Sequence, residues 1–205
     1  MLRSRKSTFI FKLYSWYLSN IINKDFAGYT FNIPEVKNSE AILLLANHFS
    51  WWDGLLMFHI NKRVFKKQFH VLVSEADYNK HSFLKYMGAF APEGKAKSTL
   101  DTLLYAGQLL DDPANLVLIF PQGKIYSSHV SSVSFEKGIM QVFNASKKKF
   151  QVVFSVTLMD HSKRKPVLRT DLLRWDAEEY ISLQLLKSEY NKHYQKTLRN
   201  QNTSL

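Results

Sequence analysis

The stretch Ala41-Ile-Leu-Leu-Leu-Ala46 is the longest purely apolar run of the 205-residue chain, and Asn47-His-Phe-Ser-Trp-Trp-Asp53 follows it directly. Six apolar residues without a polar break are typical of a strand buried on both faces, as in a parallel sheet. Polar residues just beyond such a strand lie where ligands bind in open α/β sheets. The stretch therefore predicts a central strand with a candidate site at its end.

Outward from this strand, the chain alternates predicted strands and helices. Strands are expected at 70–74, 88–90, 116–120, 150–157 and 167–172, and helices at 50–60, 82–87, 98–110, 135–146 and 178–200. Ser50 and Asp53 fit a capping box at the start of the helix expected at 50–60. The alternation favours an α/β fold with a mostly parallel central sheet flanked by helices. The length, with no visible repeat or linker, predicts a single domain over residues 1–205.

Composition narrows the classes of function. The chain has 28 Lys and Arg against 17 Asp and Glu, a formal net charge of +11, and no Cys. Disulfides, cysteine-ligated zinc, iron–sulfur clusters and thiol nucleophiles are thereby excluded. The positive charge favours anionic partners: nucleic acid, anionic lipid or a phosphate-bearing substrate. Because the basic residues are spread over several segments without a recognition-module pattern, no nucleic acid partner is expected.

The N-terminal segment, residues 1–24, holds five basic residues and no acidic one. Apolar residues follow helical spacing within it: Ile10, Leu13, Tyr14, Tyr17, Leu18 and Ile21. A basic amphipathic helix of this kind can lie in a bilayer interface, and a terminal helix that caps the core would show the same pattern. No run reaches the length of a membrane span, and no cleavage site follows the basic start. We therefore expect a peripheral protein on the cytoplasmic face of a membrane.

His48 and Asp53 are a candidate catalytic pair. A strand-to-helix turn can bring the carboxylate to one imidazole nitrogen, which leaves the other nitrogen as a general base. Taken alone, the pattern fits equally a capping Asp53 and a surface His48. His48, His59, His70 and His81 recur every eleven residues, a spacing typical of no metal site. Trp51 and Trp52 are expected in the core or an interface.

Two further segments carry turn signals with positive charge. Phe120-Pro-Gln-Gly-Lys-Ile125 follows a predicted buried strand, and its turn amides can approach an anion. Gly88-Ala-Phe-Ala-Pro-Glu-Gly94 precedes Lys95 and Lys97. Neither segment alone is more than an ordinary turn.

In this order and spacing, the three segments resemble the PlsC-type glycerolipid acyltransferase family over roughly residues 40–160. The first family motif, Asn-His-x4-Asp, is matched in full by Asn47, His48 and Asp53. The third, Phe-Pro-Glu-Gly-Thr-Arg, is matched by Phe120, Pro121 and Gly123, while Gln122, Lys124 and Ile125 replace the other residues. Of the second motif only Gly88 matches, with Gly94 where an Arg is expected. The fourth motif corresponds to 152–156 and lacks its final Pro.

The resemblance implies acyl transfer without a metal or cofactor, in which His48 deprotonates an acceptor hydroxyl and Asp53 orients His48. Acyl-CoA or acyl-carrier protein is the implied co-substrate, and a lipid is the implied acceptor. The implied substrate-binding residues are Asn47, Gly88, Lys95, Lys97, Phe120, Pro121, Gln122, Gly123 and Lys124.

In this family, two motif arginines bind the phosphate of the acceptor, and both are missing here. The resemblance therefore does not decide whether the acceptor carries a phosphate. In one alternative, Lys95, Lys97 and Lys124 substitute for the arginines as phosphate ligands. In the other, the acceptor has no phosphate and is a lyso-aminolipid, a pigment or glycolipid hydroxyl, or another lipid alcohol. The alternatives to an enzyme are a non-catalytic membrane-binding member of the same fold and a basic nucleic-acid-binding protein.

Overall fold

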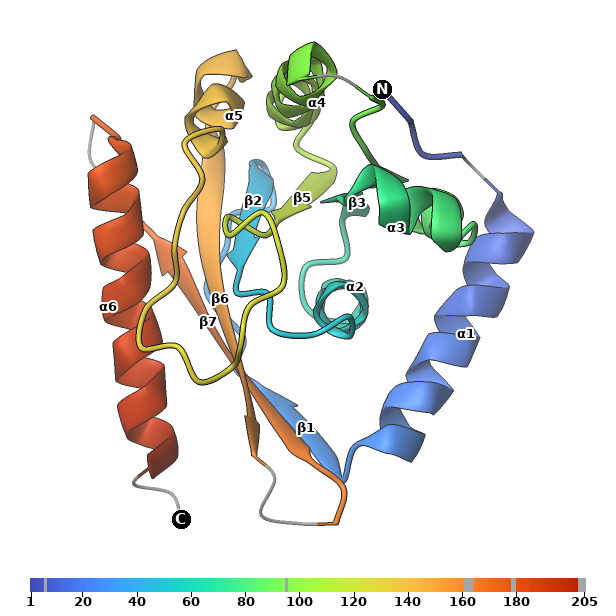
Figure 1. The fold of residues 1–205 in the computed structure, drawn as a ribbon, viewed down its shortest axis with the longest axis vertical. Coiled ribbons are helices and arrows are strands. Elements are labelled where there is room, and N and C mark those ends of the chain that lie inside the picture. The colour runs from blue at the N-terminus through green and yellow to red at the C-terminus, as the bar shows by residue number, and fades with distance from the viewer. Residues whose placement is uncertain (6, 95, 161–163, 178–179, 203–205) are drawn as a thin grey trace.

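The central strand predicted from the sequence lies in the middle of a seven-stranded sheet (Figure 1). The computed structural model describes residues 1–205 except 6, 95, 161–163, 178–179 and 203–205. The strands, in the order in which they pair, are β1 (Gly28–Phe31), β7 (Val167–Trp175), β6 (Phe150–Asp160), β2 (Ala41–Ala46), β5 (Asn115–Ile119), β3 (Gln68–Leu72) and β4 (Ala89–Phe90). Every neighbouring pair is parallel except β6 and β7. The mostly parallel α/β architecture is confirmed.

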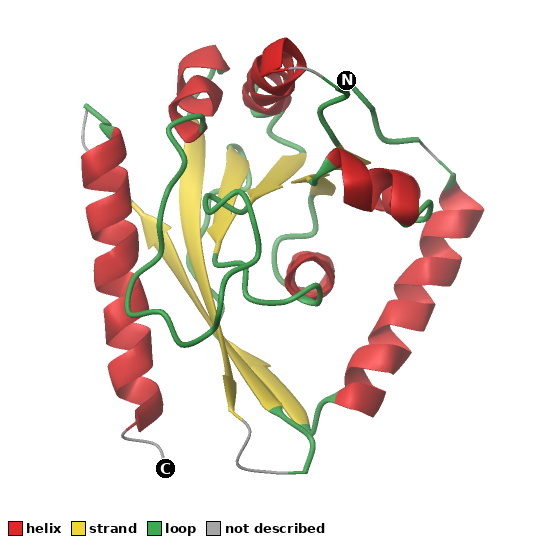
Figure 2. Cartoon of the chain, viewed as in Figure 1, coloured by secondary structure: helices red, strands yellow, loops and turns green. Residues whose placement is uncertain are grey.

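Helices cover both faces of the sheet (Figure 2). They are α1 (Thr8–Asp25), α2 (Asp53–Arg63), α3 (Glu75–Lys80), α4 (Ala96–Leu109), α5 (Ile139–Ala145) and α6 (Leu183–Asn202), with the short 3₁₀ helix η1 (Leu84–Met87). All six residues of β2 are buried, and successive side chains point to opposite faces. Ile42 and Leu44 join a core with α1 and α2. Leu43 and Leu45 join a second core with α4, α5 and α6.

The segment after β2 corrects the predicted capping box. The helix begins at Asp53, not at Ser50, because the Ser50 hydroxyl accepts the Trp52 amide at 3.1 Å and residues 51–52 form a turn. The helix also continues to Arg63, beyond the predicted end at residue 60. The reciprocal half of the box is present, since the Ser50 amide donates to the Asp53 carboxylate at 2.8 Å.

Between β3 and β4 the predicted boundaries are wrong. Ser74, predicted as the end of a strand, caps the unpredicted helix α3 by accepting the Asp77 amide at 3.0 Å. The helix predicted at 82–87 is reduced to η1, a 3₁₀ turn that ends at Gly88. Just after β4, Ala91 pairs with Leu2 of the N-terminal segment in an isolated antiparallel bridge.

One strand and the starts of two helices also differ from the prediction, and β6 and β7 extend to Asp160 and Trp175, beyond their predicted ends. β1 was not predicted and pairs with β7, a strand from the far end of the chain. α5 begins at Ile139, not at 135, because the Glu136 amide donates to the carbonyl of Pro121 at 2.8 Å and holds the preceding residues to a loop. α6 begins at Leu183, not at 178, where the Ser182 hydroxyl caps it by accepting the Leu185 amide at 3.1 Å.

The predicted N-terminal helix exists as α1, and its apolar residues divide between two environments. Leu18 and Ile22 are buried in the core with α2. Leu13 and Tyr17, predicted on the same stripe as Leu18, are 50% exposed. The stripe is therefore too wide for one packing surface, and only one of its edges caps the core.

Candidate active site

The candidate site lies at the carboxyl ends of β2 and β5, which are neighbours in the sheet. Asn47 and His48 follow β2, and Phe120 follows β5. The His48 and Phe120 rings stack with centroids 4.0 Å apart and an interplanar angle of 16°. Two segments more than 70 residues apart in sequence are thereby joined at one edge of the sheet.

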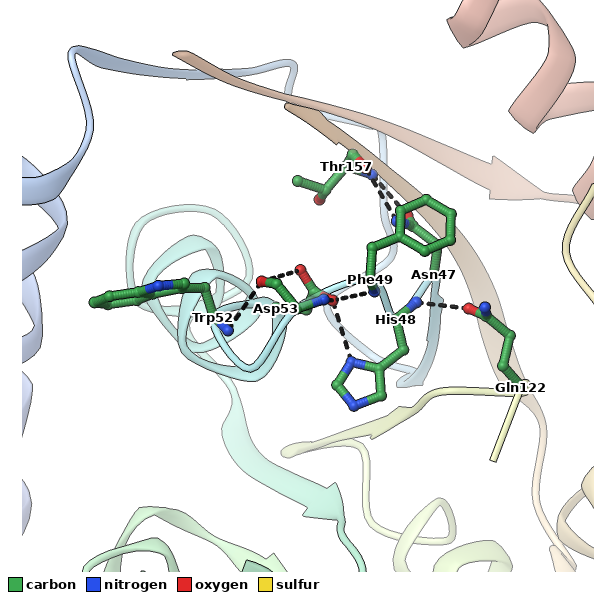
Figure 3. A network of polar contacts seen from close by, with 8 residues as sticks. Asn47, His48, Phe49, Trp52, Asp53, Gln122 and Thr157 are labelled. Carbon is green, nitrogen blue, oxygen red and sulfur yellow. Dashed lines mark hydrogen bonds and ion pairs between the residues drawn. The ribbon is translucent and has the colours of Figure 1, made fainter. Parts of the chain in front are cut away.

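His48 and Asp53 form the pair that the sequence predicts (Figure 3). Nδ1 of His48 lies 3.1 Å from Oδ2 of Asp53, and the side chains are 20% and 7% exposed. The Asp53 carboxylate can only accept a hydrogen bond, so Nδ1 of His48 carries the proton that is donated to it. In the neutral imidazole, Nε2 is then unprotonated. Nε2 is then the nitrogen that can take a proton from a ligand.

The Asp53 carboxylate is held by the backbone of its own turn. Oδ2 accepts the amides of Phe49 at 2.6 Å and Ser50 at 2.8 Å, and Oδ1 accepts the Ser50 hydroxyl at 3.3 Å. These hydrogen bonds fix the position of the carboxylate relative to the turn. The arrangement supplies a fixed negative charge beside the imidazole.

Asn47 anchors the start of the turn to the neighbouring strand. Its side chain donates to the Thr157 carbonyl at 3.0 Å and accepts the Thr157 amide at 2.8 Å, which joins the end of β2 to β6. Tyr190 of α6 donates its hydroxyl to the Ser155 carbonyl at 2.7 Å in the same region. Burial raises the pKa of Tyr190 well above its usual value, so this hydroxyl stays a donor. Asn47 is 1% exposed and acts as a support of His48.

The segment after β5 fixes the backbone of His48 from the other side. Oε1 of Gln122 accepts the His48 amide at 2.6 Å, and the Tyr126 amide donates to the His48 carbonyl at 3.0 Å. Gln122 is 1% exposed, so its side chain serves this link. Gly123 turns the chain with φ +70°, a left-handed value that favours glycine.

A cavity of about 750 Å³ opens beside His48 and extends along both faces of the sheet edge. One part is apolar and lies against α2, β3 and η1, where it is lined by Leu55, Phe58, Phe69, Val71, Leu84 and Met87. The other part lies against α4 and α5 and includes Thr99, Thr102, Leu103 and Ile139. His48 and Phe120 line the cavity at the carboxyl ends of β2 and β5, strands whose alternate side chains belong to the two cores.

The remaining predicted site residues fall into different places. Pro121, Gly123 and Lys124 line the cavity. Lys97 is exposed on α4 and does not belong to the cavity wall, and Lys95 lies outside the described residues. Gly88 supports the fold: its φ is +92°, and a Cβ there would lie 1.9 Å from the Phe69 carbonyl oxygen.

Sequence reasoning missed several residues of the cavity wall. Trp51, expected in the core or an interface, is 40% exposed and lines the cavity. Glu136 and the apolar residues Phe58, Phe69 and Met87 also line it. These residues lie in α2, β3, η1 and the loop before α5, and no local pattern indicates them because only the packing of separate elements brings them together.

No group of three or more His, Cys, Asp or Glu side chains is placed to hold a metal ion in the part of the chain that the structure describes. Among the same residues, no helix combines the length and the apolar character needed to cross a membrane.

Comparison with known proteins agrees with the geometry. A family model described as Acyltransferase matches residues 30–158, more than half of the chain. The match begins within β1 and ends within β6, and it includes every residue of the His48 turn (residues 47–53). No curated protein matches the chain.

Proposed function

The chain belongs to the acyltransferase family, the family of PlsC-type glycerolipid acyltransferases, and from this premise we propose that it transfers a fatty acyl group from acyl-CoA or acyl-carrier protein to a lipid hydroxyl. The observation that carries the proposal is the His48–Asp53 pair, 3.1 Å apart at the wall of the cavity. An intact pair of this kind argues against a non-catalytic member of the fold.

In the proposed reaction His48 acts as general base. Nε2 accepts the proton of the acceptor hydroxyl while the hydroxyl oxygen attacks the thioester carbonyl carbon. The tetrahedral intermediate collapses with cleavage of the carbon–sulfur bond, and the thiolate takes the proton back from His48. Asp53 holds the imidazole in orientation and stabilises its protonated form between the two steps.

The apolar part of the cavity supports a fatty acyl chain as the transferred group. Phe58, Phe69 and Met87 offer a wall without charge, and burial of each methylene there contributes about 0.8 kcal/mol. Such a wall would hold the thioester carbon near His48. A donor with a long chain is therefore preferred over acetyl-CoA.

The acceptor does not fit a terminal phosphate well. Gly94 and Ile125 occupy the positions of the family's two phosphate-gripping arginines. Of the three candidate substitutes, Lys124 alone lines the cavity among the described residues. A single ammonium is a weaker phosphate ligand than two bidentate guanidinium groups. We therefore expect lysophosphatidic acid to be a poor acceptor.

The outer face of α1, defined as Phe9, Leu13, Trp16 and Tyr17, supports a peripheral place on the cytoplasmic face of a membrane. These four residues share one side of the helix by their spacing and are at least 50% exposed. Lys12 and Lys24 are exposed on the same helix. Aromatic side chains beside lysines suit the interface of an anionic bilayer, where a lipid acceptor is found.

Acyl transfer by the purified protein tests the proposal. His48→Ala should lower turnover of a long-chain acyl-CoA with a lipid acceptor by about 10²–10⁴, the contribution of a general base. Asp53→Asn should also lower it strongly, because the amide cannot hold the same tautomer with a negative charge. The control is His129→Ala, which removes an exposed imidazole outside the cavity wall and keeps the pair and its hydrogen bonds. Turnover of the wild-type kind in a folded His48→Ala protein would end the proposal.

A further inference from the structure

Two opposite charges without a charged partner lie on the cavity wall close to His48. Lys124 and Glu136 both line the cavity, on either side of the loop that leads from β5 to α5. They form no ion pair with each other. Within the described residues, Lys124 has only the ring of Tyr126, 5.2 Å away, as a charge-related contact.

The Glu136 side chain is held beside the turn that supports His48. Its backbone amide donates to the Pro121 carbonyl at 2.8 Å. Its Cγ lies 3.1 Å from the place where a Cβ of Gly123 would stand, so the side chain lies over the glycine. The same turn binds the backbone of His48 through Gln122. The backbone of the exposed Glu136 is therefore fixed by the same turn that binds the backbone of His48, and its side chain begins beside that turn.

The other two carboxylates of the cavity wall each accept one hydrogen bond from the protein. Glu75 accepts the Gly94 amide at 2.9 Å, and Asp77 accepts the Ser74 hydroxyl at 2.6 Å. In the described part of the chain, the Glu136 carboxylate has no such hydrogen bond or ion pair. Among the described carboxylates of the wall, Glu136 is the one with both oxygens open to a ligand.

We propose that the acceptor lipid has a zwitterionic headgroup, whose protonated amine binds Glu136 and whose anionic group binds Lys124. This inference rests on the proposed acyl transfer. Opposite charges that remain apart in the protein can each gain a charge-assisted hydrogen bond from a ligand that carries both signs. A purely anionic headgroup would instead meet the uncompensated Glu136 carboxylate, which disfavours it.

Matched acceptors isolate the effect of the amine. Lysophosphatidylethanolamine and lysophosphatidylglycerol share the acyl chain and the phosphodiester, and only the first carries an amine. Kinetics with both, with lysophosphatidic acid and with an uncharged monoacylglycerol should give the highest kcat/KM for lysophosphatidylethanolamine. Glu136→Gln should raise KM for that acceptor about fivefold, the effect of one solvent-accessible charge pair. Glu136→Lys should favour lysophosphatidylglycerol.

Two exposed residues outside the cavity wall serve as controls: Asp101→Asn removes a carboxylate from α4, and Lys137→Gln removes a charge next to Glu136. Both should leave the order of acceptors unchanged. A wild-type enzyme that acylates lysophosphatidylglycerol, lysophosphatidic acid or monoacylglycerol better than lysophosphatidylethanolamine would overturn the inference and keep the proposed function. Equal effects of Glu136→Gln on both phosphodiester acceptors would also overturn it. If no lipid is acylated in a His48-dependent manner, the proposed function itself fails.

Discussion

The His48 turn and the outer face of α1 differ in how their groups are held: the first by hydrogen bonds within the protein, the second by few contacts with it. In the turn, the backbone groups of His48 are bonded by Gln122 and Tyr126, and Asp53 accepts two further amides. On the outer face, apolar side chains such as Phe9 and Trp16 lie mostly in solvent. The proposed general-base role needs fixed geometry, which hydrogen bonds supply, whereas the proposed membrane contact needs only apolar area and positive charge.

α2 connects the two regions. It begins at Asp53, and its Phe58 ring packs edge-on against Phe11 of α1 with centroids 5.5 Å apart. Through α2, a substitution in one region can shift side chains of the other region. If the two regions are independent, changes in the turn should alter stability and turnover, and changes on the outer face should alter neither.

The largest effect on stability is expected in the turn, at Asn47. Asn47→Ala removes both partners of the Thr157 backbone, and leaving such buried groups unsatisfied should lower the free energy of unfolding by about 3 kcal/mol. Urea unfolding measures the change. Asn20→Ala is the matched control, because the exposed Asn20 of α1 makes one hydrogen bond, to the Trp16 carbonyl. Its effect should stay within about 0.5 kcal/mol. Similar losses in both variants would contradict the contrast between the regions.

The fold was predictable where one segment carries its own signal. β2 is a purely apolar run, and its six residues are all buried, so its place in the sheet centre follows from sequence. β1 has no comparable pattern, because its four residues are partly exposed and gain their register from β7. The starts of α3 and α6 depend on which serine caps them, a choice that tertiary packing decides.

Within the candidate site, the His48–Asp53 pair was predictable because one segment carries its whole signal. His48 and Asp53 are close in sequence, and a single turn brings them together. The cavity wall joins α2, β3, η1, α4 and the loop after β5, so no local pattern could indicate Phe69 or Met87. Glu136 reaches the site only because its backbone returns to Pro121.

An intermediate effect is expected from His59, buried in α2 between the two regions. Desolvation, with the nearby positive charges of Arg63 and Lys62, lowers the pKa of His59 to about 4. Between that value and its ordinary pKa of 6.5, the unfolded chain binds a proton that the folded protein does not. The contribution of neutral His59 to the free energy of unfolding is therefore fully present above pH 6.5. It is lost as the pH falls from 6.5 toward 4.

Urea unfolding at pH 7 and at pH 5 should show this loss as about 2 kcal/mol from His59. His59→Gln should reduce the pH dependence without removing it, because burial also lowers the pKa of His193. His129→Gln, at an exposed position, should leave it unchanged. An unchanged pH dependence in His59→Gln would mean that the protein takes up this proton without unfolding.

The smallest effect, and the sharpest test of independence, concerns the outer face of α1. Deleting residues 1–24 would be a poor test, because Leu18 and Ile22 belong to the core and their loss should unfold the protein. Phe9→Ser with Trp16→Ser removes exposed aromatic area alone. We expect about tenfold weaker sedimentation with vesicles of equal parts phosphatidylglycerol and phosphatidylcholine, as the loss of two partly inserted rings implies.

Three comparisons decide the outcome. Thermal unfolding and turnover of a short-chain, water-soluble acceptor should match the wild type, because neither side chain supports the His48 turn. Tyr180→Ser, at an equally exposed aromatic residue outside α1, should bind vesicles as the wild type does. Binding of the wild type should weaken in high salt and persist, since salt screens Lys12 and Lys24 but not apolar burial. Unchanged vesicle binding in the double variant would remove the outer face from the membrane contact, and slower turnover of the soluble acceptor would show that α2 couples the two regions after all.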